Sequence, residues 1–308
     1  MRYIAADDIR RELTWDIAIE ALIRGHRYPP PQVQDILLSD MPYSLFGRGV
    51  ILPGVGAGMK VASIFPPNQD RSPPTPVEHA IFVVVDNCSK QIVAVLDGPE
   101  LTRWKTAADS ALGSRLLSRE DSKSLLVIGA GPIAAALANA HLAMRPGVQN
   151  VLLWNRRPER LAPLQAALSG RGHTTTIVSN LEEAVASADI ITSATGAQTP
   201  LICGNDIRPG SHVDLVGGFT PTMREADDEL ISKARVFVDY RPTAVDGSGD
   251  LCQPIASGVL TTEDVQGDLY DMAINAPARQ SEDITLYKNA GGAHLDLMVA
   301  AALLKNMQ

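Results

Sequence analysis

The sequence predicts an α/β fold with a strand-rich part followed by a parallel-sheet part, and two observations support this. Between residues 36 and 96, apolar and β-branched runs are separated by Gly, Pro, Asn and Asp, a pattern typical of strands joined by turns. Between residues 124 and 240, short apolar runs alternate with helical stretches. Such alternation indicates a parallel sheet covered by helices on both faces.

The individual elements are expected in a definite order along the chain. Thr14 has the side chain to cap a helix, and the prolines that start at Pro29 break the chain after it. A helix is expected at 101–118, and an apolar, mostly helical segment at 284–304. Strands are expected at 49–55, 59–65, 80–86 and 91–97, and then at 124–131, 151–155, 188–195, 212–218 and 235–240, with helices at 134–144 and 158–168 between them.

Composition and charge exclude several classes of protein. The 308 residues are 45% hydrophobic, enough for a sizeable core, and the formal net charge of −8 without a long basic run argues against a nucleic-acid partner. No apolar run is long enough to span a membrane, and the charged start MRYIAADDIRREL lacks the apolar block of a signal peptide. Cys88, Cys203 and Cys252 show no metal-ligand spacing, so we expect free thiols, a cytoplasmic protein and no metal site.

A glycine-rich turn follows the expected strand SLLVI and opens a helix. In the pattern G-x-G-x-x-G/A the first glycine makes the tight turn, the second lets the backbone approach a pyrophosphate, and a small third residue, here Ala134, lets helix and strand pack closely. The helix N-terminus favours an anion. We therefore expect a dinucleotide here rather than a tight turn with nothing bound, with contacts from Gly129, Ala130, Gly131, Pro132 and Ile133.

The end of the next strand, VLLWN, predicts which dinucleotide is bound. A carboxylate is often found at this point, where it accepts a hydrogen bond from the ribose 2′-OH of NAD and would repel the 2′-phosphate of NADP. Here Asn155 is followed by Arg156 and Arg157, which can pair with that phosphate. We therefore expect NADP(H) to be preferred, with NAD(H) possible. For one of the two arginines the alternative is a solvated position at the start of a helix.

Several segments together resemble the ornithine cyclodeaminase/mu-crystallin family. They occur in the order GMKVASIFPPN, LDGPELTRWKTAADSAL, VIGAGPIA, DIITSAT, RPGSHVDLVGGFTP, GDL and ITLYKNAGGAHLDL, and they cover most of residues 50–300. The resemblance implies a Rossmann-type parallel-sheet domain, 118–289, which binds NAD(P). It is inserted into a strand-rich α+β domain, 1–117 plus 290–308, for substrate binding and dimerisation. A homodimer is therefore expected.

The resemblance also implies roles for particular residues. Lys60 matches the lysine that holds the substrate carboxylate, with a plain surface lysine as the alternative. Thr75, Thr195, Val216, Gly217, Gly218, Phe219 and Asn289 fall where the family contacts the cofactor, and Ala290 falls beside the substrate. His294 is a candidate proton donor because a histidine titrates in the useful range, although a buried histidine of the core is the competing interpretation.

Three departures from the family pattern bear on the chemistry. Lys105 stands for an arginine that touches cofactor and substrate, and it keeps the charge without the bidentate fork. Gln32 is the nearest match to a second carboxylate-binding arginine. Phe219 stands where ornithine cyclodeaminases have an aspartate that acts as general acid and base, and a phenyl ring cannot transfer a proton.

Phe219 therefore favours the reductase branch, which includes ketimine and Δ1-pyrroline-2-carboxylate reductases. We expect an NADP(H)-dependent oxidoreductase that reduces the C=N bond of a small cyclic 2-imino acid, with Δ1-pyrroline-2-carboxylate, giving proline, as the leading substrate. Lys60, Lys105 and His294 are the expected catalytic residues, and Gln32, Lys60, Lys105 and Ala290 are expected to bind substrate. Two alternatives stay open: an NAD-dependent ornithine cyclodeaminase, and a non-catalytic NADPH- and ligand-binding protein similar to mu-crystallin.

Overall fold

The computed structural model describes residues 1–307, and their contacts divide the chain into two compact units. The first unit is Met1–Lys105 together with the residues from Gly292 onward, and the second is Thr106–Gly291. The expected boundary lay after residue 117, so the division falls within a helix, α3 (Gly98–Leu117), rather than after it. The chain therefore enters the second unit along a continuous helix.

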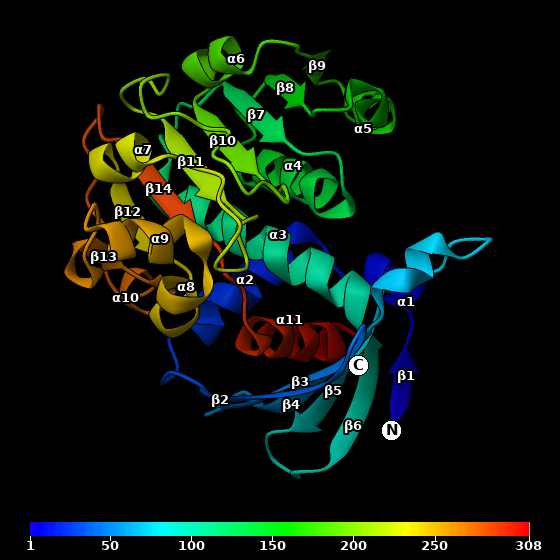
Figure 1. Ribbon diagram of the computed structural model, residues 1–308. Coiled ribbons are helices and arrows are strands. Elements are labelled where there is room, and N and C mark those ends of the chain that lie inside the picture. The colour runs from blue at the N-terminus through cyan, green and yellow to red at the C-terminus, as the bar shows by residue number, and fades with distance from the viewer. Residues whose placement is uncertain (308) are drawn as a thin grey trace. The chain divides into compact units, whose positions relative to one another are not determined.

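The first unit is built on a six-stranded sheet with the order β1-β6-β5-β4-β3-β2 (Figure 1). β1 pairs with β6 in parallel, and every other neighbour in this sheet is antiparallel, as the turn-separated runs of the sequence predict. The strands are β1 (Arg2–Ile4), β2 (Gln32–Asp40), β3 (Tyr43–Leu52), β4 (Gly56–Ile64), β5 (Glu78–Asp86) and β6 (Ile92–Asp97).

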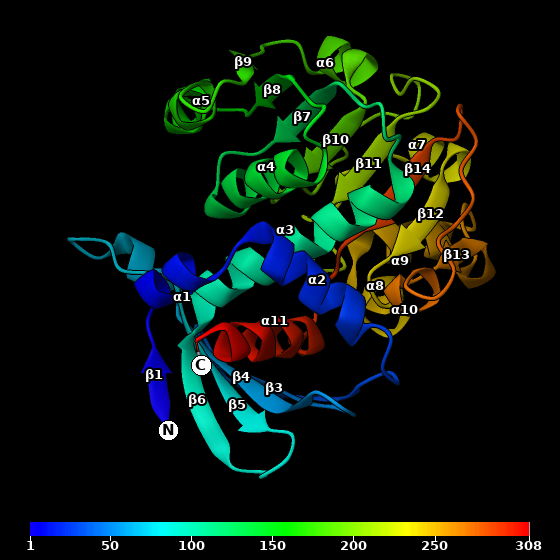
Figure 2. The ribbon, with the colours of Figure 1, turned by 180° about the vertical axis from the view of Figure 1, so that it is seen from behind.

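Helices cover one face of this sheet. α11 (Ala293–Asn306) packs against β3, β4 and β5 and lies beside α2 (Trp15–Gly25), as Figure 2 shows. Thr14 caps α2 as expected, because its side chain accepts a hydrogen bond from the N–H of Ile17 at 3.3 Å. The remaining helical turns of this unit are α1 (Ala6–Glu12) and η1 (Pro66–Asp70).

The second unit contains an eight-stranded sheet in the order β13-β12-β14-β11-β10-β7-β8-β9, in which all neighbours are parallel. This confirms the parallel sheet expected from the alternation of strands and helices. Figure 1 shows β11, β10, β7 and β8 side by side. The strands are β7 (Ser124–Ile128), β8 (Asn150–Trp154), β9 (Thr174–Ile177), β10 (Ile190–Ser193), β11 (His212–Leu215), β12 (Arg235–Val238), β13 (Val265–Gly267) and β14 (Thr285–Lys288).

The helices of this unit connect successive strands. Besides the end of α3 they are α4 (Pro132–Met144), α5 (Ala162–Ser169), α6 (Leu181–Ser187), α7 (Asp228–Lys233), α8 (Arg241–Gly247), α9 (Gly249–Ser257) and α10 (Leu269–Met272), with 3-10 turns η2 (Pro158–Leu161) and η3 (Thr262–Asp264). In residues 1–307 no helix is both long and apolar enough to cross a membrane.

The segment 284–304 is mostly helical, as expected, but the sequence did not reveal the strand β14 at its start. Its first residues form a strand between β11 and β12, and the helix α11 begins only at Ala293. All four residues of β14 are buried. A short run that is buried throughout has no periodicity to separate strand from helix, so the sequence pattern could not decide between the two.

Alternate residues of β7 enter two different cores. Leu126 and Ile128 belong to one cluster of buried residues, and Leu125 and Val127 belong to another. A strand that is buried on both faces has little freedom to shift its register. The carboxyl end of β7, where the glycine turn starts, is therefore held from both sides.

Candidate active site

The glycine turn lies between the end of β7 and the start of α4. Gly129 has a φ of +130°, and a Cβ there would lie 2.7 Å from the carbonyl oxygen of Ala194. A Cβ on Gly131 would instead meet open space, and Ala134 is fully buried in the helix–strand interface. The first glycine is thus required by the backbone, and the second leaves the N-terminus of α4 open to an anionic group.

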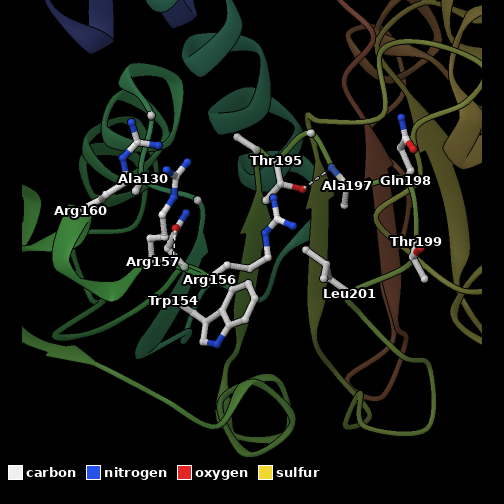
Figure 3. Close-up of a pocket in the computed structure, with 15 residues that line it drawn as sticks. Ala130, Trp154, Arg156, Arg157, Arg160, Thr195, Ala197, Gln198, Thr199 and Leu201 are labelled. Carbon is white, nitrogen blue, oxygen red and sulfur yellow. Dashed lines mark hydrogen bonds between the residues drawn. The ribbon is translucent and has the colours of Figure 1, made fainter.

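A pocket of about 560 Å³ opens at this turn (Figure 3). Figure 3 shows the side chains of Arg157 and Arg160 near Ala130, while Arg156 extends toward Thr195. Three guanidinium groups therefore reach the same pocket as the glycine turn. The residues that line it are Gly129, Ala130, Gly131, Trp154, Asn155, Arg156, Arg157, Arg160, Ala194, Thr195, Gly196, Ala197, Gln198, Thr199 and Leu201.

The polar character of this pocket suits an anion. Among the described residues that line it, none is a carboxylate, and Asn155 uses its side-chain oxygen to accept the backbone N–H of Arg157 at 2.9 Å. All three arginines are exposed. Arg160 was not expected from the sequence. The signal that could have found it is the spacing of three from Arg157, because side chains at i and i+3 of a 3-10 turn lie on the same side.

Thr195 and residues 216–219 lie at the carboxyl ends of β10 and β11. Thr195 lines the pocket, while the N–H groups of Val216 and Gly217 donate to the carbonyl oxygen of Ser193 at 2.8 and 3.3 Å. The ends of the two strands are thereby joined. The side chain of Phe219 is 63% exposed in the second unit, so it is not needed for that unit's core.

Glu225 is a residue of this loop that the sequence did not single out. It lies six residues after Phe219, and the loop folds back and buries its carboxyl group completely. One carboxyl oxygen accepts three hydrogen bonds, from Ser193 Oγ at 2.6 Å, Thr195 N–H at 2.8 Å and Thr195 Oγ1 at 2.7 Å. Burial raises the pKa of this carboxyl, against the lowering effect of the nearby Lys288 ammonium.

Asn289 and Ala290 follow β14, and both are held by their neighbours. The side-chain amide of Asn289 donates to the carbonyl oxygen of Thr106 at 2.9 Å and to Ser110 Oγ at 3.0 Å. The backbone N–H of Ala290 donates to a carboxylate oxygen of Asp239 at 3.0 Å. The Asn289 amide therefore links the end of β14 to α3 through two hydrogen bonds.

Lys60 lies on β4 in the first unit, with a side chain that is 14% exposed. Its ammonium nitrogen donates to Thr102 Oγ1 at 2.5 Å and lies 3.9 Å from a carboxylate oxygen of Asp296 on α11. Thr102 in turn donates to the carbonyl oxygen of Gly98. This charge is thus oriented by neighbours and is not that of a freely moving surface lysine.

In the sheet an arginine lies beside Lys60, whereas Gln32 lies on the opposite face. Arg48 is directly opposite Lys60 in the β3–β4 register, and Asp35 is directly opposite Arg48 in the β2–β3 register. Arg48 forms two hydrogen bonds to the Asp35 carboxylate, at 2.7 and 2.6 Å. Gln32 is three residues from Asp35, so strand alternation puts it on the other face of the sheet. The expected role of Gln32 in substrate binding stays a prediction.

Two further residues that are expected to contact the cofactor, Lys105 and Thr75, lie in the first unit. Lys105 is on α3 and is only 7% exposed, whereas Arg103 pairs with Glu100 at 2.8 Å. Arg103 is thus engaged on its own helix and does not substitute for an arginine at position 105. Thr75 is exposed, in the loop between η1 and β5, where its N–H donates to the carbonyl oxygen of Asn68.

His294 and Asp296 both lie in the first turns of α11 and are buried. Burial, followed by the charges of His26, Lys105 and Arg48, holds the pKa of His294 well below its usual value. A neutral imidazole that is sealed from solvent is poorly suited to give up a proton near neutral pH. Asp296 turns a carboxylate oxygen toward the ammonium group of Lys60.

Comparison with known proteins agrees with the sequence motifs and the fold. The model of the ornithine cyclodeaminase/mu-crystallin family matches residues 37–308. The chain is 44% identical over 308 residues to a Δ1-pyrroline-2-carboxylate reductase of Paracoccus denitrificans, covering 99% of this chain and 97% of the relative. It is 33% identical to the enzyme of the same name from Colwellia psychrerythraea, covering 100% and 99%.

A solved structure shares the whole fold. The Δ1-pyrroline-2-carboxylate reductase of Thermococcus litoralis, in complex with NADH and L-proline, superposes with a TM-score of 0.90 at 24% identity and covers 99% of this chain and 97% of its own. The chain therefore belongs to the ornithine cyclodeaminase/mu-crystallin family and is an oxidoreductase of that family.

Proposed function

We propose that this protein reduces the C=N bond of a small cyclic 2-imino acid, with Δ1-pyrroline-2-carboxylate to proline as the leading reaction and NADPH as the preferred cofactor. The observation that carries the proposal is the pocket at the glycine turn, where three arginines and no acidic residue among those described surround the position expected for the 2′-phosphate. The 44% identity to a reductase of that name supports the substrate class.

The two units supply different parts of the reaction. In the second unit, Gly129 and Gly131 with the N-terminus of α4 hold the pyrophosphate, and the three arginines hold the 2′-phosphate. Thr195 and the loop 216–219 receive the nicotinamide ribose and ring. In the first unit, Lys60 holds the substrate carboxylate, and Lys105 contributes a second positive charge. The bound dinucleotide supplies the hydride that adds to the imine carbon.

This assignment requires little acid–base chemistry from the protein. A cyclic imine near neutral pH can supply much of the proton for its own nitrogen, so the residues need only bind and orient the substrate. The burial of His294 and the exposed phenyl ring of Phe219 are consistent with that requirement. An elimination of ammonia from ornithine would need a group that moves protons, and Phe219 cannot do so.

We also propose that the protein is a cytoplasmic homodimer formed through the strand-rich unit. β2 carries consecutive exposed apolar side chains, with Ile36 51%, Leu37 64% and Leu38 61% exposed. Runs of this kind are typical of surfaces that another chain covers. Molar mass by light scattering checks the dimer, and Leu37→Asp should shift it toward the monomer.

A substrate panel followed by NADPH absorbance tests the activity. It contains pyrroline-, piperideine- and thiazoline-carboxylates, pyruvate with ammonia or methylamine, and L-ornithine with NAD. We expect oxidation of NADPH with Δ1-pyrroline-2-carboxylate above the other imines. No turnover with any of them, despite tight NADPH binding, would indicate the non-catalytic binding protein instead.

A further inference from the structure

Three ionisable side chains are completely buried in the second unit, beneath the loop that follows β11. They are Glu225, Asp250 in α9 and Lys288 at the end of β14, and each is 0% exposed. The Lys288 ammonium lies 3.1 Å from a carboxylate oxygen of Asp250. Removing ions from water is costly, so a buried ion pair is weak evidence for a stabilising role. The hydrogen bonds of these three side chains indicate which segments of the unit they hold in place.

The bonds of this buried cluster lead to two segments. Lys288 donates to the carbonyl oxygen of Gly217, and Glu225 accepts the N–H and hydroxyl of Thr195 together with the hydroxyl of Ser193. Asp250 accepts the backbone N–H of Glu225 at 2.6 Å and so holds that residue in place. The cluster thus joins the end of β10 to the loop after β11.

The two glycines of this loop pack directly on the carboxyl groups. A Cβ on Gly217 would overlap the carbonyl oxygen of Thr195 and lie 2.5 Å from Glu225 Oε1, and a Cβ on Gly218 would overlap a carboxylate oxygen of Asp250. Gly218 also has a φ of +56°, which disfavours other residues. The two glycines of VGG are therefore required by the backbone of Thr195, by the positive φ of Gly218 and by the two buried acids, because only glycine leaves these groups room.

We propose that Glu225, Asp250 and Lys288 are positioning residues that hold Thr195 and the Gly217–Gly218 turn in the shape that receives the nicotinamide half of the cofactor. The inference rests on the proposed function, because it takes that function's assignment of Thr195 and residues 216–219. It adds that Thr195 and the Gly217–Gly218 turn are held by a buried polar cluster and not by the strand ends alone.

The roles of the two acids differ. Burial raises the pKa of Glu225, which favours a neutral carboxyl whose oxygen still accepts three hydrogen bonds. Asp250 instead forms an ion pair with Lys288. At position 225 the acceptor oxygen is thus the feature that matters. Glutamine retains that oxygen and leucine does not.

The experiment compares Glu225→Gln with Glu225→Leu in the full-length protein and uses two ligands. NADPH contains the nicotinamide, while 2′-phospho-ADP-ribose lacks it but keeps the adenosine, the 2′-phosphate and the pyrophosphate. We expect Glu225→Leu to weaken NADPH binding about tenfold or more, the scale of a lost hydrogen-bond network, and to leave the nicotinamide-free ligand within about twofold. Glu225→Gln should bind both ligands nearly as the wild type does.

Asp189 provides a matched control. It is also a buried carboxylate, it precedes β10, and it accepts hydrogen bonds from Lys123 and Ser124 at the opposite end of that strand. Asp189→Asn should lower the melting temperature without changing the affinity for one ligand more than for the other. Ser193→Ala removes one hydrogen bond to Glu225 from a small buried side chain, so it gives a second test, with a weaker effect in the same direction, should Glu225→Leu not fold.

The outcomes separate the two hypotheses. If the wild type binds both ligands and Glu225→Leu binds them equally well, or loses both to the same degree, the positioning role is wrong while the proposed function stands. If the wild type binds neither ligand, the proposed function itself fails.

Discussion

Asn155 Oδ1 accepts the backbone N–H of Arg157 at 2.9 Å, so the residue at the end of β8 serves as a turn acceptor. A carboxylate at this point would present a negative charge to a ribose 2′-phosphate. Asn155 presents none, and the turn that it forms carries Arg156 and Arg157 to the rim of the pocket, where Arg160 joins them (Figure 3).

The first prediction concerns cofactor choice. NADPH should bind more tightly than NADH, and replacing Arg156 and Arg157 together by alanine should narrow the difference by roughly 1–3 kcal/mol, the scale of hydrogen bonds to a charged group. Arg160→Ala should also reduce the difference in affinity between NADPH and NADH. Arg171→Ala, which removes an exposed arginine outside the pocket, is the control. Equal affinity of the wild type for NADH and NADPH in a fluorescence titration would refute the assignment.

The second prediction concerns Lys60. Lys60→Ala should lower kcat/KM for the imine by about tenfold or more, since one charge-assisted contact is worth about 1.5–3 kcal/mol. NADPH affinity should stay nearly intact. Lys305→Ala, at an exposed position of α11, is the matched control and should leave both quantities unchanged. An equally active Lys60→Ala would mean that this lysine only fills the space between β4 and Thr102.

The local parts of the site could be predicted from the sequence. The strand–turn–helix at Gly129 and the arginines after Asn155 are encoded by adjacent residues, and the structure brings them to one pocket. Non-local relations were missed. Glu225 reaches Thr195 only because the chain between them folds back, and Lys288 meets Asp250 across 38 residues of sequence. No periodicity signals such pairs.

The sequence also could not show which face of the sheet a side chain of β2 occupies. Gln32 was matched to a family arginine that binds the substrate carboxylate, but a difference of one position in strand alternation moves a side chain to the opposite face of the sheet. The register of β2, β3 and β4 instead aligns Asp35, Arg48 and Lys60 across the sheet. That register depends on turns whose geometry the composition alone does not specify.

The third prediction concerns stability in acid. Burial lowers the pKa of His26 to about 4 and that of His212 to about 3, and it holds the pKa of His294 well below its usual value. The unfolded chain binds these protons at the ordinary histidine pKa of about 6.5, so stability is full above that pH and falls as the pH drops toward 4. Each histidine should contribute a slope of up to about 1.4 kcal/mol per pH unit.

Denaturant unfolding between pH 7 and pH 4 measures this slope. His26→Gln should reduce it, because the neutral amide has no proton to gain, while His79→Gln, at an exposed position of β5, should not. A slope that is the same in the wild type and in His26→Gln would contradict the prediction for His26.

The last prediction separates reduction from deamination and concerns Phe219. The wild type should oxidise NADPH with Δ1-pyrroline-2-carboxylate and release no measurable ammonia from L-ornithine with added NAD, because deamination needs a proton-transfer group that Phe219 lacks. Phe219→Asp should fold normally, since Phe219 is 63% exposed. It should nevertheless lose reductase activity, since a charged and unpaired carboxylate beside the bound nicotinamide ring would cost a few kcal/mol if desolvated.

The substitution is not expected to create a deaminase, because Lys105 and Gln32 also depart from the cyclodeaminase pattern. An ammonia assay coupled to proline detection measures both products in the wild type and in Phe219→Asp, with Phe219→Leu as an apolar control that should retain reductase activity. Steady ammonia release by the wild type, matched by proline formation, would overturn the reductase assignment in favour of ornithine cyclodeaminase. Full reductase activity in Phe219→Asp would instead show that this side chain stays away from the bound cofactor.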